Sequence, residues 1–346
     1  MTDLIPLKDL SVGALESLLE DWGYPKYRAR QLMRWMYQER ESDFANMTDL
    51  PLELRQQLKK EAEAKPLRAR QKRKSKDGTI KFLLEANDGQ KIETVLIPAE
   101  EQKRTTVCIS SQVGCAMGCS ICATGKMGFS RNLSCGEIIE QVILAEQYAK
   151  QSVTNIVFMG MGEPLANYEA VLEAIFAMID PERLALGSRR ITVSTCGLVP
   201  QMRRLADEKL QIGLAISLHA PEDGLRDQLV PINKKHPIKE VLEAASYYVS
   251  KTNRRVTFEY ALIDGVNDST VHASKLGELL VGLLCHVNLI PVNPANGFSR
   301  SSEEAVLSFQ EVVRNAGIPV TVRSERGVDI SAACGQLAIA AARVER

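Results

Sequence analysis

The first 66 residues carry a helical pattern of hydrophobic and polar positions and no strand-like alternation. Apolar side chains recur at helical spacing in VGALESLLEDWG, YRARQLMRWMYQ and LPLELRQQLKKEAEA. In the second segment, Leu32, Met33, Trp35 and Met36 form one apolar stripe, because side chains three and four residues apart lie on the same helix face. We therefore predict a small helical domain over residues 1–66.

Between residues 67 and 104 the pattern becomes that of strands. The runs TIKFLLEA and KIETVLIP flank the residues NDG, and Asp88-Gly89 is a preferred dipeptide for a tight hairpin turn. Basic residues precede the first of these runs. We predict that this part of the chain is a basic segment and a β-hairpin that link the helical domain to the remainder.

Beyond residue 104, strand and helix patterns alternate. TTVCIS at 105–110 is followed by the helical run EIIEQVILAEQYA, and similar pairs continue to EAVLSFQEVVRNAG. Such alternation is typical of parallel βαβ units. About six units are too few for a closed eight-unit barrel, so we predict an α/β fold with an open, partial parallel β/α barrel over residues 105–346. A doubly wound sheet is the alternative, although no G-x-G-x-x-G motif lies in a βα turn.

Composition and charge exclude several classes of protein. The chain has 43 Lys+Arg against 43 Asp+Glu, and 45% of its residues are hydrophobic, as in ordinary globular proteins. No apolar run approaches the roughly 20 residues of a membrane helix, and residues 1–10 lack the pattern of an export signal. We expect a cytoplasmic protein with no membrane partner.

Overall neutrality conceals a local excess of positive charge. Residues 65–81 hold eight basic side chains and one acidic side chain, and Lys26, Arg28, Arg30 and Arg34 add a second basic group. A charge run is most often only a solvated surface, but such groups can also neutralise the phosphates of a nucleic acid. Neutrality therefore excludes a uniformly basic protein, not an RNA-binding one.

The cysteines point to metal or catalytic chemistry. Eight cysteines in a chain without an export pattern are unlikely to form a disulfide framework. Cys115, Cys119 and Cys122 have the spacing C-x3-C-x2-C, directly after the first predicted barrel strand. Structural zinc normally takes four protein ligands, whereas three cysteines suit a [4Fe-4S] cluster with one open iron. A zinc site completed by Cys135, or unpaired structural thiols, are the alternatives.

At this point the sequence resembles a known family. VCISSQVGCAMGCSICATGKMGFSRNL, followed by Gly-Met-Gly-Glu-Pro at 160–164, is similar to the RlmN-type adenosine C2 RNA methyltransferases of the radical S-adenosylmethionine (SAM) superfamily. Their close relatives are the Cfr-type C8 methyltransferases. The resemblance extends from YRARQLMRWMYQ to DISAACGQL. It implies a radical-SAM partial barrel, one [4Fe-4S] cluster on Cys115, Cys119 and Cys122, and two SAM molecules per turnover.

The resemblance also assigns SAM binding to residues at predicted strand ends. They are Gly162, Glu163, Ser194, Ser217, Leu218, His219 and Asn293. β/α barrels place their chemistry at the carboxyl ends of the strands, and glycines allow close approach of the backbone to a ligand. Without the resemblance, MGMGEPL could be an ordinary βα turn, and His219 a hydrogen-bonded structural histidine.

A reactive cysteine pair is implied as well. In the family, the residue at Cys334 takes a methyl group from one SAM, and a second SAM gives a 5′-deoxyadenosyl radical that removes a hydrogen atom from that methyl. The resulting carbon radical adds to adenine C2, and Cys108 then attacks the sulfur of Cys334 and leaves a disulfide that must be reduced. Glu93 occupies the position of the proton acceptor. On the residues alone, both cysteines could be small buried hydrophobes, and Glu93 a solvated strand carboxylate.

Three cysteines have no matching role. We expect Cys135 at the start of a helix, Cys196 close to the SAM-binding loops and Cys285 in the barrel core.

The resemblance implies two RNA substrates and an external electron donor. The substrates are an adenosine in the peptidyl-transferase centre of 23S rRNA and adenosine 37 of tRNA, just 3′ of the anticodon. Either base must be unstacked to enter a barrel, and a flavodoxin or ferredoxin would supply the electron. The leading interpretation is adenine-C2 methylation. Methylation of C8 in the same rRNA base and a zinc-stabilised RNA-binding protein are the alternatives; the motifs that the C2 and C8 enzymes share do not separate them.

Overall fold

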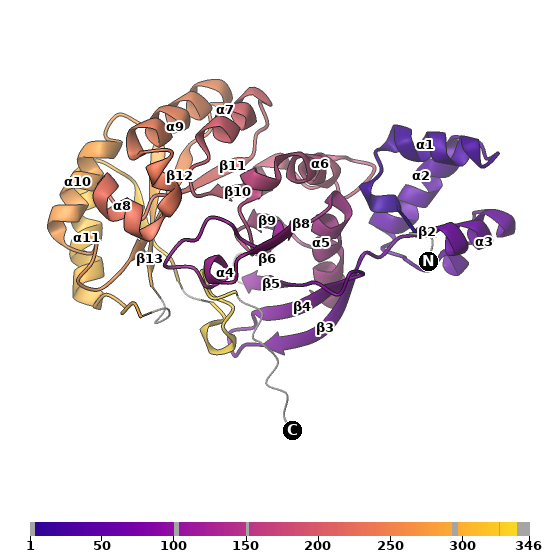
Figure 1. Ribbon diagram of the computed structural model, residues 1–346, viewed down its shortest axis with the longest axis horizontal. Coiled ribbons are helices and arrows are strands. Elements are labelled where there is room, and N and C mark those ends of the chain that lie inside the picture. Colours follow the sequence, from indigo (N-terminus) through magenta and orange to yellow (C-terminus); the bar gives the residue numbers. More distant parts are fainter. Residues whose placement is uncertain (1–3, 100–103, 150–151, 293–296, 325, 338–346) are drawn as a thin grey trace.

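The computed structural model describes residues 4–99, 104–149, 152–292, 297–324 and 326–337 (Figure 1). Within these residues, ten strands form one sheet in the order β14-β13-β12-β11-β10-β9-β6-β5-β4-β3. A helical unit made by the first part of the chain lies at one side of this sheet (Figure 1). None of the described helices is both long and apolar enough to cross a membrane.

The N-terminal unit contains the helices predicted from the hydrophobic pattern. They are α1 (Val12–Asp21), α2 (Tyr27–Met33), which continues as a π-helical turn over Arg34–Gln38, and α3 (Leu52–Glu61). The side chain of Ser11 accepts a hydrogen bond from the Ala14 amide at 3.2 Å and so caps α1. Strands β1 (Ile5–Pro6) and β2 (Ala62–Glu63) pair in parallel and bring the ends of the unit together. Two-residue strands leave no periodicity in a sequence, so this pair was not predicted.

The next strands form an antiparallel meander. β3 (Leu67–Lys74), β4 (Ile80–Ala86), β5 (Lys91–Ala99) and β6 (Arg104–Cys108) pair in that order. The predicted turn at Asp88-Gly89 joins β4 to β5, and Gly89 has a φ of +81°. The basic segment, expected to be part of a linker, is instead the edge strand β3. Lysine and arginine side chains suit an edge because they oppose pairing with further strands.

Parallel strands complete the sheet. β6 pairs with β9 (Asn155–Phe158), and β10 (Ile191–Thr195), β11 (Gly213–Ser217), β12 (Val256–Leu262), β13 (Cys285–Pro291) and β14 (Val320–Val322) follow in parallel. β14 adds one strand to the predicted set. The two edges of the described sheet, β3 and β14, do not pair, which confirms the prediction of an open, partial barrel.

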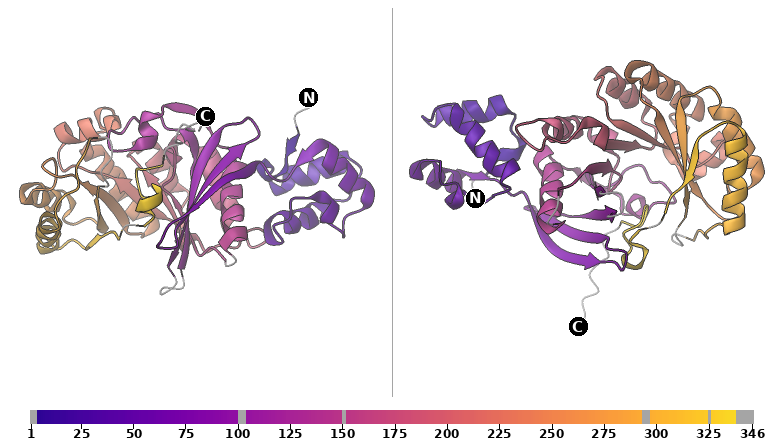
Figure 2. Two further views of the ribbon diagram at one scale, coloured as in Figure 1. Left: turned by 90° about the horizontal axis from the view of Figure 1, so that it is seen from below. Right: turned by 180° about the vertical axis from the view of Figure 1, so that it is seen from behind.

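Helices cover the outer face of the curved sheet (Figure 2). They are α5 (Cys135–Ala149), α6 (Tyr168–Ile179), α7 (Val199–Asp207), α9 (Ile238–Thr252), α10 (Thr270–Leu280) and α11 (Glu303–Asn315). The short helix α8 (Asp223–Leu229) follows β11 and contacts the carboxyl ends of β10 and β11 through Arg226. A smaller antiparallel pair, β7 (Gln112–Gly114) and β8 (Phe129–Asn132), flanks the short helix α4 (Ala123–Lys126). This pair holds the three-cysteine loop between its strands.

Helix α5 joins the N-terminal unit to the barrel. Lys8 of the unit forms a buried ion pair with Glu140 of α5, and the Asp9 carboxylate accepts a hydrogen bond from the Gly136 amide at 2.5 Å. Removing one partner of a buried ion pair typically costs about 3–5 kcal/mol. These contacts therefore fix the position of the helical unit on the barrel.

Candidate active site

Most of the residues predicted to bind cofactors line one cavity at the carboxyl ends of the parallel strands, here called the strand-end cavity. Predicted residues in its lining are Cys115, Cys119, Cys122, Gly162, Glu163, Ser194, Ser217, His219 and Cys334. Leu218 is not in the lining. The whole residue is 0% exposed, its amide donates to the Glu259 carbonyl at 3.0 Å, and its carbonyl accepts from Arg226 at 3.1 Å. Asn293 lies outside the described residues.

The three-cysteine loop has the tight geometry that its glycines predicted. Gly114 and Gly118 have φ values of +76° and +65°, and a Cβ on Gly114 would lie 1.9 Å from the Gly128 carbonyl oxygen. The Cys115 amide donates to the same carbonyl at 2.8 Å. The start of the loop therefore lies against the residue that precedes β8, too close for any side chain at Gly114.

The chemistry of this loop fits an iron–sulfur cluster. Cys115, Cys119 and Cys122 carry free thiols. Burial, together with the smaller effects of Glu163 and Cys122, raises the pKa of Cys115 to about 11. Burial, together with the smaller effects of Cys122 and Cys115, raises the pKa of Cys119 to about 12. Several thiolates become stable at such a site only beside a cationic centre. No three His, Cys, Asp or Glu side chains among the described residues already stand at metal-binding spacing, so the fit rests on the donor set and its shared cavity.

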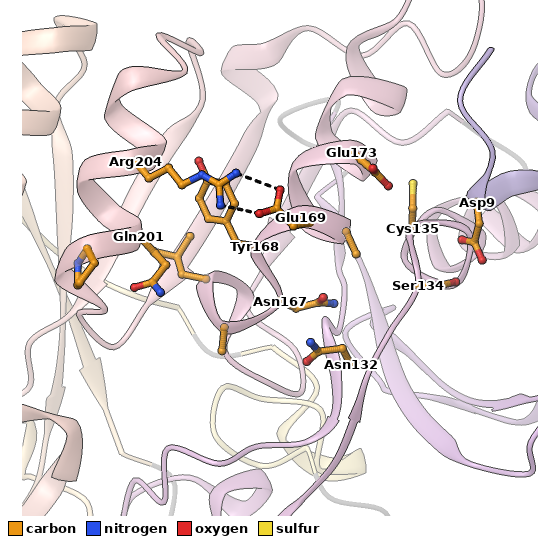
Figure 3. A pocket seen from close by; sticks show the side chains of 14 residues that line it. Asp9, Asn132, Ser134, Cys135, Asn167, Tyr168, Glu169, Glu173, Gln201 and Arg204 are labelled. Carbon is orange, nitrogen blue, oxygen red and sulfur yellow. Dashed lines mark hydrogen bonds and ion pairs between the residues drawn. The ribbon is translucent and has the colours of Figure 1, made fainter. Parts of the chain in front are cut away.

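Cys135 does not complete this set. It begins α5, as predicted, and lines a separate surface hollow with Asp9 and Ser134, between the helical unit and helix α6 (Figure 3). In the same hollow, Arg204 forms an ion pair with Glu169 (Figure 3). Neither this hollow nor the strand-end cavity brings Cys135 together with the three-cysteine loop, which argues against the four-cysteine zinc site.

Glu163 is held by backbone amides at the floor of the strand-end cavity. Its side-chain oxygens accept hydrogen bonds from the amides of Leu165 at 3.0 Å and Cys196 at 2.8 Å. Burial nevertheless raises the pKa of Glu163 above its ordinary value. Gly162 beside it has a φ of +100°, and a Cβ there would lie 2.6 Å from the Gln112 side chain. The two backbone amides thus fix the orientation of the Glu163 carboxylate. A cation in the cavity would offset the free-energy cost of burying its negative charge.

His219 is a neutral group in this site. Its Nδ1 accepts a hydrogen bond from the Ala261 amide at 3.0 Å, which places the ring proton on Nε2. Burial lowers the pKa of His219 to about 3. Its backbone has a left-handed φ of +59°, which is uncommon for a residue other than glycine. The side chain therefore offers a hydrogen-bond donor, not a positive charge, to the strand-end cavity.

Arg226, on α8, was not predicted to belong to the site. Its side chain is fully buried, and it donates to the carbonyls of Cys196 at 2.7 Å, Ser217 at 3.1 Å and Leu218 at 3.1 Å. A fourth bond goes to the Asn233 side chain at 2.7 Å. One guanidinium thus joins the loops after β10 and β11. No local sequence signal marks it, because its partners come from three separate segments.

Cys108 and Cys334 line a second cavity, here called the barrel cavity, inside the curved sheet. Cys334 lines both cavities, whereas Cys108 lines only the barrel cavity. Burial, together with the smaller effect of the nearby Cys334, raises the pKa of Cys108 to about 12. Arg323 lines both cavities as well, and the neighbouring Cys334 raises its pKa. Cys334 therefore stands at the boundary between the two cavities, beside a guanidinium that the sequence did not reveal.

Glu93 lies outside both linings. It is on β5, only 5% exposed, and its Oε1 forms an ion pair with Lys81 Nζ at 2.9 Å. The reading of Glu93 as a solvated strand carboxylate is therefore wrong. Of the remaining cysteines, Cys196 lines the strand-end cavity and Cys285 is buried at the start of β13, as expected.

Comparison with known proteins adds relatives of similar length. Residues 109–275 match the family model described as Radical SAM superfamily, and residues 5–64 match the Ribosomal RNA large subunit methyltransferase N-terminal domain. The chain is 47% identical over 335 residues to a protein of Thermoanaerobacter pseudethanolicus named "Probable dual-specificity RNA methyltransferase RlmN", covering 96% of this chain and 97% of that one. A protein of the same name from Geobacillus kaustophilus is 46% identical over 333 residues, covering 95% and 91%.

A solved structure shares both fold and sequence with this chain. It is the crystal structure of a radical SAM methyltransferase from Sphaerobacter thermophilus, with a TM-score of 0.93 and 52% identity. The match covers 96% of this chain and 99% of that chain. The likeness therefore includes the N-terminal helical unit as well as the barrel.

Proposed function

Because this chain belongs to the RlmN family of radical SAM RNA methyltransferases, we propose that it methylates C2 of adenosine in 23S rRNA, at the peptidyl-transferase centre, and at position 37 of tRNA. SAM and one [4Fe-4S] cluster are the cofactors of this superfamily. One observation carries the proposal: Cys108 and Cys334, far apart in the sequence, line a single cavity, and Cys334 also lines the strand-end cavity that contains the three-cysteine loop.

The residues of the strand-end cavity would hold both cofactors. Cys115, Cys119 and Cys122 ligate the cluster, which when bound supplies the electron that cleaves SAM to methionine and a 5′-deoxyadenosyl radical. Glu163 would accept a hydrogen bond from the ammonium group of SAM, and that cation would offset the burial that raises the pKa of Glu163. The remaining SAM contacts are proposed for Gly162, Ser194, Ser217, Leu218, His219 and Asn293.

Cys334 acts as the methyl carrier, and its place at the boundary of the two cavities supports this role. A group on its Sγ can face SAM on one side and an adenine in the barrel cavity on the other. After the radical adduct has lost one electron and the C2 proton, Cys108 attacks Sγ of Cys334 and a disulfide forms. The bond between Sγ and the transferred carbon breaks, and the carbon keeps that electron pair and takes up a proton to become the methyl group. Because burial raises the pKa of Cys108 to about 12, a base must take its proton before it attacks.

Glu93 is proposed to accept the proton that leaves C2. Its Oε1 forms an ion pair with Nζ of Lys81 at 2.9 Å, which holds the carboxylate in place. Glu93 lines neither cavity. To accept the C2 proton, it therefore needs either a water molecule that relays the proton or a movement of the adenine or of its own side chain that brings the two together.

Each turnover leaves a disulfide that must be reduced. A flavodoxin or ferredoxin is proposed as the electron donor to the cluster.

Strand β3 supplies the strongest candidate surface for RNA. Arg68, Arg70, Lys72, Arg73 and Lys74 are exposed along this edge strand. Of the four basic residues named in the N-terminal unit, Lys26 pairs with Glu20 and Arg34 with Asp49. Of the five on β3, Arg70 pairs with Glu85, so a larger share of the positive charge on β3 is left for a nucleic acid. We therefore assign phosphate contacts to β3 first, with an affinity that falls as salt rises.

Nucleoside analysis of RNA tests the proposal. Anaerobically reconstituted protein, SAM and a reductant are incubated with 23S rRNA or tRNA, and the digested nucleosides are separated by mass spectrometry. We expect 2-methyladenosine from both RNAs. Detection of 8-methyladenosine instead would show that the enzyme methylates C8 and would contradict the proposal. Stoichiometric zinc without about four irons per chain would end the radical interpretation.

Three cysteine variants test the carrier mechanism. Cys334→Ala should abolish methylation, while Cys285→Ala, a buried barrel thiol outside both cavities, should retain it. Cys108→Ala should leave RNA covalently attached at Cys334, because the attack that releases it is lost. Retained methylation by Cys334→Ala would contradict the carrier mechanism.

A further inference from the structure

Cys334 lies in a loop that is fixed on two sides. This loop, residues 327–337, is called the Cys334 loop. On one side, the Ala123 amide donates to the Gly335 carbonyl at 2.8 Å, and Thr124 Oγ1 donates to the Leu337 carbonyl at 2.6 Å. These bonds join the Cys334 loop to α4, directly after the three-cysteine loop. Figure 1 shows the yellow C-terminal segment between α4 and the ends of β3 and β4.

On the other side, the Cys334 loop is bonded to the turn between β3 and β4. The Gly327 amide donates to Asp77 Oδ2 at 2.8 Å, and Ser75 Oγ donates to Asp329 Oδ1 at 2.6 Å. Gly327 has a φ of +67°, and a Cβ there would lie 2.9 Å from the Thr79 side chain. Although burial acts to raise it, the amides of Thr79 and Gly327 hold the pKa of Asp77 at about 2. At neutral pH the Asp77 carboxylate in this turn is therefore ionised and accepts the hydrogen bond from the Cys334 loop.

Lys81, two residues beyond this turn, makes a different kind of contact. Its side chain is 9% exposed, and its Nζ lies 2.9 Å from Glu93 Oε1. The same Nζ donates to the Ser331 carbonyl at 3.0 Å. Ser331 has a left-handed φ of +53° and stands three residues before Cys334. One ammonium group therefore bonds to the proposed proton acceptor and to the loop of the proposed methyl carrier.

A purely structural role would not require this arrangement. A buried ion pair is often no more stabilising than an apolar pair of similar volume, and a buried ammonium needs only acceptors to compensate its burial. The acceptors of Lys81 instead come from two elements that methyl transfer must align, β5 and the Cys334 loop. The lysine reaches them from β4, a strand with no other assigned part in the chemistry.

We propose that Lys81 is a positioning residue for methyl transfer to RNA: its ammonium fixes Glu93 and the Cys334 loop relative to each other. The inference rests on the proposed roles of Glu93 and Cys334. Lys81 touches neither RNA nor SAM in this proposal; it acts through the two groups that it bonds. Its loss should slow transfer from Cys334 to RNA even when SAM and RNA are bound at saturation.

The first experiment measures the Cys334 loop without measuring activity. Reconstituted holoenzyme is alkylated with iodoacetamide for graded times, and labelling of Cys334 is followed by peptide mass spectrometry. Lys81→Met should raise the labelling rate at least about threefold, because the loop opens locally more often. Lys81→Arg, which keeps the charge and the donors, should remain near the wild-type rate. Lys91→Met is the matched control, since Lys91 pairs with Glu85 at the surface of the same sheet, at 3.8 Å.

The second experiment measures single-turnover transfer of a labelled methyl group from Cys334 to saturating RNA. Lys81→Met should reduce the rate about tenfold or more, because misplacement by about 1 Å can cost up to about a hundredfold. Lys81→Arg should restore most of the rate. In a double-mutant cycle, adding Lys81→Met to Glu93→Gln should cost much less than Lys81→Met alone.

Lys81→Gln keeps the test valid if Lys81→Met does not fold. Its amide can still donate to the Ser331 carbonyl but carries no charge for Glu93, so labelling should stay near wild type while transfer falls. A folded Lys81 variant without charge that labels and transfers at wild-type rates would overturn the proposal. Wild-type holoenzyme that never places a methyl group on Cys334 would instead contradict the proposed function, and the labelling result would still stand.

Discussion

Replacing Arg226 with methionine should destabilise the loops that follow β10 and β11. The guanidinium is fully buried and donates to three backbone carbonyls, at Cys196, Ser217 and Leu218. Methionine is long, flexible and apolar, so it fills much of the same space without any donor. Arg226→Lys keeps the charge, but a single ammonium lacks the planar fork that reaches carbonyls on both loops. Both variants should therefore lose stability, and methionine should lose more.

The contacts set the size of the effect. A buried acceptor left without a donor costs about 1–3 kcal/mol, and removal of a buried charge recovers part of that cost. For three carbonyls we expect the free energy of unfolding to fall by about 3–5 kcal/mol. An unfolding entropy of about 2.1 cal/mol/K per residue gives about 0.7 kcal/mol/K for 346 residues. The Tm should then fall by about 4–7 °C.

Thermal unfolding followed by circular dichroism measures this change. Arg204→Met is the matched control, because Arg204 is also a helix arginine but pairs with Glu169 at the surface, and exposed ion pairs contribute little. Its Tm should stay within about 1 °C of wild type. SAM affinity should fall for Arg226→Met alone, since the carbonyls belong to the strand-end loops. A Tm for Arg226→Met as high as that of the control would refute the assigned role of the buried guanidinium.

Three further changes have defined outcomes. Burial holds the pKa of His219 at about 3 against an ordinary 6.5. The folded state therefore keeps its full stability, as far as His219 determines it, above about pH 6.5, and loses stability as the pH falls towards 3, because the unfolded chain then binds the proton more tightly. Urea unfolding at pH 7.5 and pH 5 should show that His219→Gln loses less stability on acidification than wild type does. Gly162→Ala places a Cβ 2.6 Å from a side chain of β7 at a φ of +100°, and should weaken SAM binding in calorimetry, whereas Gly224→Ala, in open space, should not. Changing both Lys72 and Arg73 to Gln should reduce the slope of log affinity against log salt for single-stranded RNA by about 1.4; an unchanged slope would mean that β3 does not contact phosphates.

Periodicity predicted the elements that are long enough to repeat it. The helices of the N-terminal unit and the alternating strands from β9 to β13 bury the apolar faces seen in the sequence. β3 was missed because most of its side chains are exposed at the sheet edge, so neither face is apolar. β7, β8 and β14 have only three or four residues each, which is too short for an alternation to stand out.

The site was predictable where its chemistry is local in sequence. The three cysteines, the glycines around Glu163 and the strand-end position of His219 could all be read from short motifs. Arg226, Lys81 and Arg323 could not, because a buried charge is recognisable only through partners that the fold brings together. Leu218 shows the opposite limit: its motif matches the family, yet its side chain belongs to the core.

The two-sided attachment of the Cys334 loop also bears on the order in which the protein folds. The meander from β3 to β6 closes through short turns, so its chain-entropy cost is small and we expect it to form early. Lys81 and Ser331 meet across 250 residues of chain, so their contact should form late, after the parallel strands are in place. An intermediate would then have Cys108 already inside the sheet while Cys334 is still distant. Such an order keeps the two thiols apart until the fold that governs their reaction is complete.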